Sequence, residues 1–398
     1  MYNLYFFEIF HPDMTGFTTY KNELFTGLGG LCDAKINIIT LASPVSQLSC
    51  RKIGGVCQYG IPSIKNQPKD EIALILKQFI EDSTETFYFV NYAPSYPTIK
   101  MLREYFPQGK IIRVIHDFMW ATFLLGDVGR LKRILLRQEK CPNVSLIESI
   151  YSDDYKSYHA VDKVVCLSED TKQILKKIYE VPEAKLSVIH NGQSDGTNIV
   201  RPRHELRQER KISPMEKILV YVGRVSRQKG IMDVLEAFPA ILAEVPKCKL
   251  VIVGEIDENI QAAVEKHFKE NIFMTGVLSK QQVYEWYNMA DIGLLPSYYE
   301  QCSYVGIEMK MFGLPIVASD GMGVRNMVDE NNGIIARIGD RNGGNEYQVN
   351  LVKAIVNALT LSSEETEKLR RKSREQYTRE YTATAMAKKY VALINSFF

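Results

Sequence analysis

The first chemically suggestive segment of this chain is a short loop that carries two cations. An apolar run over residues 218–222 ends directly in Gly223 and Arg224, and a helical pattern begins after Lys229 and Gly230. Such a turn places backbone N–H groups, a guanidinium and an ammonium beyond one strand end, and these groups can neutralise a diphosphate. A tight strand-to-helix turn with solvated basic residues explains the same pattern about equally well.

Two carboxylates form the second candidate. Glu300 and Glu308 follow an apolar run at residues 292–295, and we expect a helix to begin near Ser303. Glu308 would then lie inside the helix and Glu300 in the loop before it, close to free N–H groups of the first turn. Paired carboxylates can accept hydrogen bonds from vicinal hydroxyls. Taken alone, two solvated glutamates are the simpler interpretation, because most glutamates lie at the surface.

A histidine follows one of the apolar runs that are expected to be buried strands. His116 follows Ile111 to Ile115, so it is expected at the carboxyl end of a strand. Without further information a core histidine with satisfied hydrogen bonds is the simpler interpretation. The six histidines are dispersed and no D-x-D motif occurs, so we expect no catalytic metal.

The elements that must position these residues are strands alternating with helices. Short runs rich in Ile, Val, Leu, Tyr and Phe alternate with longer stretches of helical period, which is typical of parallel sheets covered by helices on both faces. The strands are expected at residues 4–10, 35–41, 87–91, 111–116, 163–167, 186–189, 218–222, 250–253, 272–275, 292–295 and 315–318. This predicts an α/β fold with two doubly wound, Rossmann-like domains facing each other across a cleft, which is the default active site.

The expected boundaries follow from composition. Residues 193–217 are polar and lack either periodicity, so a connection is predicted at 196–215 between an N-terminal domain, 1–195, and a C-terminal domain, 216–375. Residues 376–398 are expected to form a C-terminal helix that packs back on the N-terminal domain.

Composition excludes several function classes. The chain has 398 residues and a net charge of +2, so no overall field marks a nucleic-acid binder. No stretch of 18 apolar residues occurs, and the N-terminus lacks a basic region before its apolar run. The seven cysteines are scattered without a C-x-x-C pair. We therefore expect a cytoplasmic protein.

A basic stretch suggests a second kind of contact. Residues 129–140, GRLKRILLRQEK, interleave five cations with leucine and isoleucine at near-helical spacing. A basic amphipathic helix can lie on an anionic membrane surface or meet a lipid-linked acceptor. A solvated helix whose leucines enter the core is the simpler alternative.

Taken together, these segments resemble the retaining nucleotide-sugar glycosyltransferases of family 4, which have the two-domain GT-B architecture. The resemblance is strongest from Lys217 to Gly333. It implies that Arg224 and Lys229, beside Gly223, hold the donor diphosphate. It also implies that Glu300 contacts the transferred sugar and Glu308 the nucleotide ribose.

Looser matches extend the implied site. Gly276 and Val277 resemble the turn at the base, Gly16 the glycine loop near the donor phosphates, and His116 the histidine at the donor sugar. Gln301, Cys302 and Ser303 stand where the family commonly has small glycines. This departure leaves donor identity open, so the nucleotide base and the sugar are not specified.

The resulting reading is a metal-independent, retaining, hexosyl-type glycosyltransferase that needs no cofactor beyond its nucleotide-sugar donor. Its acceptor would be a hydroxyl of a saccharide or glycoconjugate. Glu300, His116, Arg224 and Lys229 are the expected catalytic residues. Two alternatives remain open at this stage: a nucleotide-sugar epimerase or hydrolase on the same fold, and a catalytically silent subunit that binds a partner enzyme.

Overall fold

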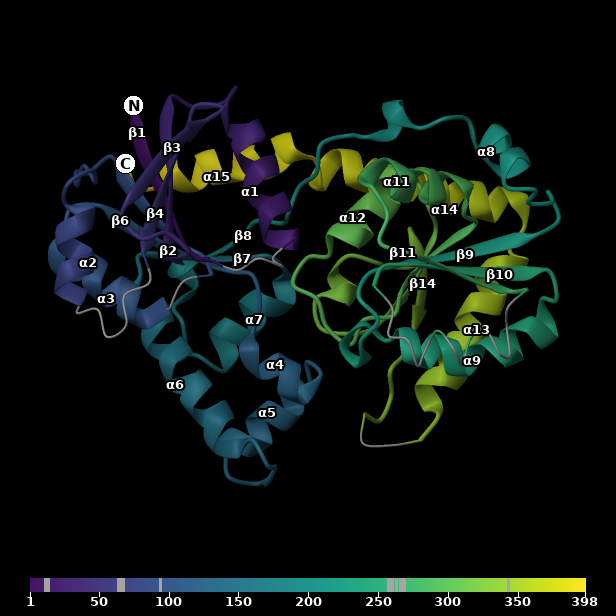
Figure 1. Cartoon of the computed structure of the whole chain (residues 1–398). Coiled ribbons are helices and arrows are strands. Elements are labelled where there is room, and N and C mark those ends of the chain that lie inside the picture. The colour runs from purple at the N-terminus through teal and green to yellow at the C-terminus, as the bar shows by residue number, and fades with distance from the viewer. Residues whose placement is uncertain are drawn as a thin grey trace. The chain divides into compact units, whose positions relative to one another are not determined.

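The computed structural model describes residues 1–10, 15–62, 69–92, 95–255, 261, 264, 270–341 and 344–398 (Figure 1). Contacts divide the chain into two compact units. The first comprises Met1–His190 together with Ala383–Phe398, and the second comprises Asn191–Thr382. The divisions therefore fall at 190/191 and 382/383, whereas composition placed the domain ends at 195 and 375.

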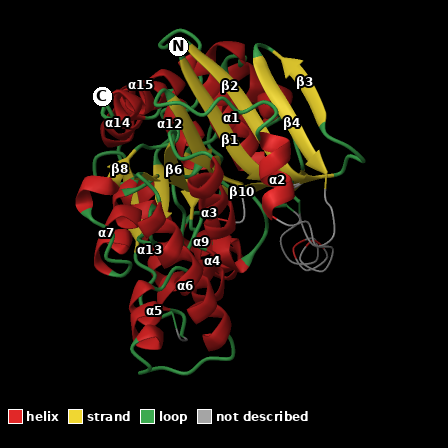
Figure 2. Ribbon diagram, turned by 90° about the vertical axis from the view of Figure 1, so that its left-hand side faces the viewer, coloured by secondary structure: helices red, strands yellow, loops and turns green. Residues whose placement is uncertain are grey.

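The first unit is built on an eight-stranded sheet of order β3-β4-β2-β1-β5-β6-β7-β8 (Figure 2). All neighbouring strands are parallel except β3 with β4, which are antiparallel. The strands are β1 (Tyr2–Ile9), β2 (Ala34–Ser43), β3 (Ser49–Ile53), β4 (Val56–Pro62), β5 (Thr86–Val90), β6 (Lys110–Ile115), β7 (Lys163–Cys166) and β8 (Leu186–Val188).

Helices cover this sheet because its central strands are buried on both faces, and β5 has no residue that reaches the surface. The helices are α1 (Thr15–Leu28), α2 (Lys69–Leu76), α3 (Ser95–Tyr105), α4 (Met119–Leu124), α5 (Val128–Leu135), α6 (Val144–Ala160), α7 (Glu169–Lys177), the short η1 (Glu183–Lys185) and α15 (Ala383–Asn395). The chain end belongs to this unit: the hydroxyls of Tyr20 on α1 and Tyr390 on α15 are hydrogen-bonded at 2.8 Å.

The second unit has a six-stranded, all-parallel sheet of order β11-β10-β9-β12-β13-β14. Its strands are β9 (Lys217–Val222), β10 (Cys248–Val253), β11 (Ile272–Gly276), β12 (Ile292–Leu295), β13 (Ile316–Ser319) and β14 (Gly333–Ala336). Its helices are η2 (Thr197–Ile199), α8 (Arg203–Glu209), η3 (Arg227–Lys229), α9 (Ile231–Glu244), α11 (Lys280–Met289), α12 (Tyr304–Met311), η4 (Val324–Asn326), α13 (Glu346–Thr360) and α14 (Ser363–Glu380). The predicted α/β fold with two Rossmann-like sheets is confirmed.

Four details differ from the sequence-based expectation. The hairpin β3–β4 and the edge strand β14 were not expected. The connecting segment contains helix α8, because Arg203 and Arg207 donate hydrogen bonds to the carbonyls of Asn288 and Met289 and so tie a polar helix to α11. Residue 376 lies inside α14, which continues to Glu380, and α15 begins at Ala383.

Candidate functional site

The candidate site of the second unit lies where its strand order reverses. The chain runs outward from β9 through β10 to β11 and then returns to β12 on the other side of β9. Ligands of open α/β sheets bind beyond the carboxyl ends of the strands at such a reversal. The loops that follow β9 and β12 begin at residues 223 and 296, so the sequence-predicted clamp and the first glutamate come from the two loops at this position.

These two loops are in close contact. Gly230 ends the first loop at φ 68°, and a Cβ on it would lie 2.1 Å from the carbonyl oxygen of Pro296 in the second. Only glycine fits both the left-handed backbone and this approach. The loops are also joined by the Tyr298 amide, which donates to the Gln228 carbonyl at 2.9 Å.

The contact brings together two of the predicted catalytic residues. Nζ of Lys229 lies 2.7 Å from Oε1 of Glu300, and Oγ of Ser297 donates to the same carboxylate oxygen at 2.8 Å. The Lys229 and Glu300 side chains are 22% and 12% exposed. This ion pair is thus partly shielded but still open to a ligand.

The second predicted cation is more accessible. Arg224 is exposed, and among the described residues its guanidinium makes no hydrogen bond or ion pair. Its backbone carbonyl accepts a hydrogen bond from the hydroxyl of Tyr221 at 2.7 Å. Gly223, between them, has φ 147°, which a side chain would strain. This arrangement fixes the loop while leaving the guanidinium available to an anion.

Glu308 lies in the second turn of α12 and is held from α11. Its carboxylate accepts a hydrogen bond from the Tyr287 hydroxyl at 3.2 Å and forms an ion pair with Lys280 at 3.1 Å. Burial, followed by the Glu308 charge, raises the pKa of Tyr287 well above its usual value, so this hydroxyl stays a donor. The side chain of Glu308 is 10% exposed, which suits a positioned acceptor.

The three residues between the glutamates form a buried turn. Gln301, Cys302 and Ser303 are 6%, 6% and 7% exposed. Ser303 is the N-cap of α12 and accepts from the amide of Gly306 at 3.3 Å. The loop after β13 packs behind this turn: at Gly323, φ 73°, a Cβ would lie 1.9 Å from the carbonyl oxygen of Glu300.

The looser matches lie at other strand and helix ends. Gly276 closes β11 at φ 68°, and its carbonyl accepts from the amide of Gly254, which follows β10. Val277 next to it is 79% exposed. Gly16 lies in the first turn of α1 with open space where a Cβ would be, while residues 11–14 lie outside the described part of the chain.

His116 follows β6 in the first unit. Its Nε2 lies 2.9 Å from Oδ1 of Asn91, and the rings of Phe17, Tyr20 and Tyr92 surround it with centroid distances of 5.1, 4.6 and 5.1 Å. Burial, and after it the charge of Arg113, lowers its pKa to about 3. The imidazole is therefore neutral at physiological pH.

Several contributing residues were not anticipated from the sequence. Ser297 and Tyr221 hold the two loops, and Lys280 and Tyr287 hold Glu308. Lys280 and Tyr287 are seven positions apart in a helical pattern, so they share one face of α11. That spacing was a usable signal, whereas the Ser297 and Tyr221 contacts depend on tertiary packing.

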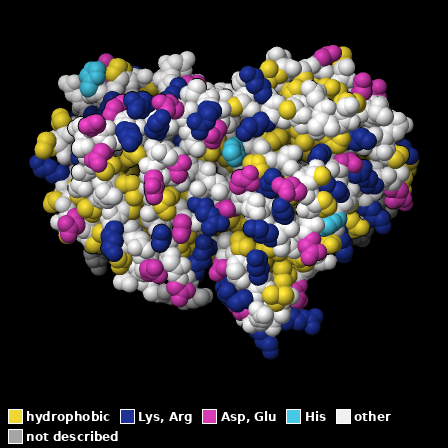
Figure 3. Space-filling view, turned by 180° about the vertical axis from the view of Figure 1, so that it is seen from behind, with side chains coloured by type: hydrophobic (Ala, Val, Ile, Leu, Met, Phe, Trp, Pro, Cys, Tyr) yellow, Lys and Arg dark blue, Asp and Glu magenta, His cyan; other side chains and the backbone are white. Residues whose placement is uncertain are grey.

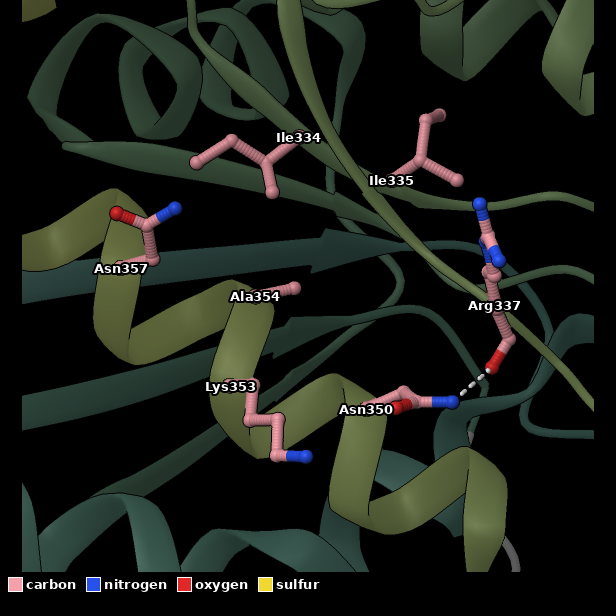
Figure 4. Close-up of a pocket in the computed structure, with 7 residues that line it drawn as sticks. All are labelled: Ile334, Ile335, Arg337, Asn350, Lys353, Ala354 and Asn357. Carbon is pink, nitrogen blue, oxygen red and sulfur yellow. Dashed lines mark hydrogen bonds between the residues drawn. The ribbon is translucent and has the colours of Figure 1, made fainter.

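A separate groove of about 280 Å³ lies between the edge strand β14 and helix α13 (Figure 4). Its lining consists of Ile334, Ile335, Arg337, Asn350, Lys353, Ala354 and Asn357. The amide of Asn350 donates to the Arg337 carbonyl at 2.9 Å. None of the predicted site residues lines this groove and it carries no carboxylate, so we place the candidate site at the paired loops instead.

The basic stretch is helical only in its first part, and two of its apolar residues enter the core, as the simpler alternative expected. Helix α5 ends at Leu135, so residues 129–140 are not one helix, and Leu131 and Ile134 are buried in the core. Glu139 forms ion pairs with Arg130 and Arg133. The helix stops there because Arg137 takes a left-handed backbone, with φ 58°.

The surface of that region nevertheless combines charge and apolar area. Helices α4, α5 and α6 form a lobe of the first unit, and its tip shows basic and hydrophobic side chains together (Figures 1 and 3). Lys132, Arg137 and Lys140 are exposed, and among the described residues they have no ion-pair partner. Leu136 and Leu146 are 67% and 47% exposed.

No described helix has the length and apolar content needed to span a bilayer. No described cluster of three or more histidine, cysteine, aspartate or glutamate side chains has the arrangement of a metal site.

Sequence comparison relates the second unit to a known family. Residues 202–376 match the family "Glycosyl transferases group 1". An uncharacterised glycosyltransferase of Methanocaldococcus jannaschii is 29% identical over 245 residues, which make up 56% of this chain and 61% of that protein. The chain thus spans less than two thirds of that relative.

Structural comparison covers the whole chain. Sucrose-phosphate synthase from Thermosynechococcus elongatus superposes with a TM-score of 0.75 at 18% identity, over 100% of this chain and 99% of that one. The catalytic domain of starch synthase IV from Arabidopsis thaliana, solved with ADP and acarbose, superposes with a TM-score of 0.68 at 14% identity, over 100% and 99%. These similarities confirm the GT-B fold.

Proposed function

We propose that this chain is a glycosyltransferase of family 4 that moves a hexosyl group from a nucleotide diphosphate donor to a hydroxyl acceptor, with retention at the anomeric carbon and without a metal ion. The observation that carries the proposal is the 2.7 Å pair of Lys229 and Glu300 at the strand-order reversal, beside the accessible Arg224. The match of residues 202–376 to group 1 glycosyl transferases supports it.

The proposed chemistry is stabilisation of a leaving group. Departure of the nucleotide diphosphate places negative charge on its oxygens, and Arg224 and Lys229 would neutralise that charge in a preorganised site. The N-terminus of α9 adds a positive helix end, since its N-cap, Gly230, supplies no side-chain acceptor for the first amides. In a retaining reaction a phosphate oxygen would take the proton from the acceptor hydroxyl.

The carboxylates would orient the donor. Glu300 would accept hydrogen bonds from hydroxyls of the sugar, and its pairing with Lys229 would link recognition of the sugar to recognition of the diphosphate. Glu308, fixed by Tyr287 and Lys280, would accept from the ribose hydroxyls. Gly16 and His116 would approach the donor phosphates and sugar, and Gly276 with Val277 the base.

The acceptor is proposed to be a saccharide or glycoconjugate at the cytoplasmic face of a membrane. The lobe tip supports a peripheral membrane contact through three exposed cations, Lys132, Arg137 and Lys140, beside exposed leucines. Cations attract anionic headgroups while exposed leucines enter the interfacial region. This surface replaces the single amphipathic helix expected from the sequence.

Donor identity can be tested by thermal shift with UDP, GDP and ADP. A ligand that binds only the native state raises the melting temperature by mass action. We expect one nucleotide diphosphate to raise it clearly above the other two, and Glu308→Gln to reduce that rise. Equal absence of a shift with all three, including at millimolar concentration, would contradict the proposal.

A further inference from the structure

His116 lies in a part of the first unit that is built like the reversal point of the second. The chain of the first unit runs from β1 outward to β2 and β4 and later returns to β5 on the other side of β1. Asn91 directly follows β5, and His116 directly follows β6, the next strand of the sheet. Both residues therefore lie at the carboxyl edge where such sheets bind ligands.

A contact of the Asn91 side chain favours one orientation of its amide. Asn91 is 1% exposed, and its Nδ2 donates to the Phe89 carbonyl at 3.4 Å. Its backbone N–H donates to the Phe7 carbonyl at 3.1 Å, and its backbone carbonyl accepts from the Arg113 guanidinium. Because Nδ2 is used in this way, the atom that faces His116 is Oδ1, which can only accept.

This orientation determines the proton on the imidazole. Nε2 of His116 lies 2.9 Å from Oδ1 of Asn91, so Nε2 must carry the hydrogen. In a neutral ring the other nitrogen, Nδ1, is then an acceptor. Among the described residues Nδ1 has no hydrogen-bond partner, so it can accept a hydrogen bond from a ligand.

The surroundings keep the ring neutral. Tyr92 stacks on it with an interplanar angle of 20°, and Tyr20 and Phe17 meet it edge-on at 70° and 71°. The charge that acts on it is that of Arg113 on the preceding strand β6, and the rings in contact with it include Tyr20 on α1 and Tyr92 after β5. Burial and the Arg113 charge lower the pKa of His116 to about 3.

We propose that Asn91 is a positioning residue that holds His116 as the Nε2–H tautomer, so that Nδ1 accepts a hydrogen bond from a hydroxyl of the donor sugar. The sugar as ligand rests on the proposed function, whereas the tautomer does not. The role differs from that of a cationic histidine, which would donate from both nitrogens and balance phosphate charge. It requires the sugar hydroxyl at this position to donate its hydrogen to Nδ1.

The tautomer can be measured directly by nitrogen NMR of the full chain labelled in its histidines. Comparison with His116→Gln identifies the signals of His116. We expect an Nε2 with attached hydrogen and an Nδ1 without one at pH 7, unchanged down to pH 5. An imidazolium, or hydrogen on Nδ1, would overturn the proposal even if the protein transfers sugar.

Asn91→Asp tests the consequence for turnover. A carboxylate beside Nε2 favours the imidazolium, so Nδ1 becomes a donor. We expect kcat/KM for transfer to fall about two- to tenfold at pH 6, the scale of one hydrogen bond, and to recover as pH rises. Affinity for the free nucleotide diphosphate should not change.

The matched control is Asn37→Asp. Asn37 is also 1% exposed in the same sheet, and its amide donates to the Leu4 carbonyl, away from His116. This variant should show any general loss of kcat/KM that a buried aspartate causes, without the change in the pH profile of kcat/KM. The same pH profile in both variants would contradict the role of Asn91. If the wild-type protein transfers no sugar from any donor, the proposed function fails. The tautomer of His116 is still decided by NMR.

Discussion

Lys229 and Glu300 are separated by 71 residues along the chain, and their side chains meet at 2.7 Å. Each comes from a loop at the carboxyl end of a central strand, and Ser297 donates to the same carboxylate oxygen. The cation proposed for the diphosphate clamp is thus already paired with the carboxylate that is proposed to hold the sugar. Removal of Lys229 would therefore leave the Glu300 carboxylate unpaired beside the diphosphate.

The first prediction concerns this pair. Lys229→Met should weaken the preferred nucleotide diphosphate by about one to two decades in Kd, because a charge-assisted bond is lost and the Glu300 carboxylate, no longer paired, repels the anion. The double variant Lys229→Met/Glu300→Gln should recover part of that loss. Calorimetric titration of the three proteins measures it. A double variant that binds more weakly than Lys229→Met would contradict this electrostatic coupling.

The second prediction separates the two glutamates. Glu300→Gln should reduce transfer sharply while leaving the affinity for free nucleotide diphosphate nearly unchanged, since that ligand lacks the sugar hydroxyls. Glu308→Gln should weaken the nucleotide itself by roughly 1.5 to 3 kcal/mol, the value of hydrogen bonds to a charged acceptor. Titration and initial rates on both variants decide it. The reverse pattern would show that the two roles are exchanged.

The third prediction concerns the lobe tip. The wild-type protein should bind vesicles containing anionic phospholipid at low salt and dissociate as salt screens the charges. Replacing Lys132, Arg137 and Lys140 by glutamine should lower the partition coefficient roughly a hundredfold, at about 1 kcal/mol per cation. Replacing Arg337 and Lys353, which lie in the second unit, is the matched control and should change little. Equal vesicle binding by the lobe-tip variant and the control variant would contradict a membrane contact at the lobe tip.

The fourth prediction concerns a buried lysine. Lys310 is 0% exposed, and its ammonium donates to Oε1 of Gln376 at 2.7 Å. Burial lowers its pKa from 10.5 to about 7, although the charges of Asp329 and Glu380 act in the opposite direction. Between pH 7 and 10.5 the unfolded state therefore binds more protons than the native state at this residue, so this contribution to stability increases as pH rises.

Lys310→Met should remove that contribution. The difference in unfolding free energy between wild type and variant should change by up to about 1.4 kcal/mol per pH unit inside the window, in favour of the wild type at higher pH. Lys353→Met, at an exposed position of α13, provides the control. Denaturation curves of the three proteins from pH 7 to 10 measure the slope. A pH-independent difference would mean that Lys310 does not titrate there.

Much of the fold was predictable because buried parallel strands have a clear signature. β5 and β9 appear in the sequence as continuous apolar runs, and helices follow them with clear periodicity. The hairpin β3–β4 was missed because its strand β3 is largely exposed and polar, so it lacks that signature despite the Gly54–Gly55 turn. Helix α8 was missed because its stability comes from arginines bonded to carbonyls of α11, a tertiary contact.

The site was predictable in its residue types and only partly in its contacts. The spacing of Glu300 and Glu308 relative to Ser303 correctly anticipated one carboxylate before helix α12 and one inside it. The Lys229–Glu300 pair could not be derived, because it depends on which strands are neighbours in the sheet. The environment of His116 likewise depends on aromatic residues from three separate segments, which no local pattern brings together.

Acceptor-dependent release of nucleotide diphosphate would show the proposed transferase activity itself. The wild-type protein, Lys229→Met and Lys353→Met would be incubated with UDP-, GDP- and ADP-sugars, with and without a panel of saccharide and lipid-linked acceptors. We predict release with one donor only when an acceptor is present, similar rates for Lys353→Met, and at least about a hundredfold loss for Lys229→Met. Release without any acceptor would indicate a hydrolase, and equal release by Lys229→Met would contradict the proposed role of the paired loops.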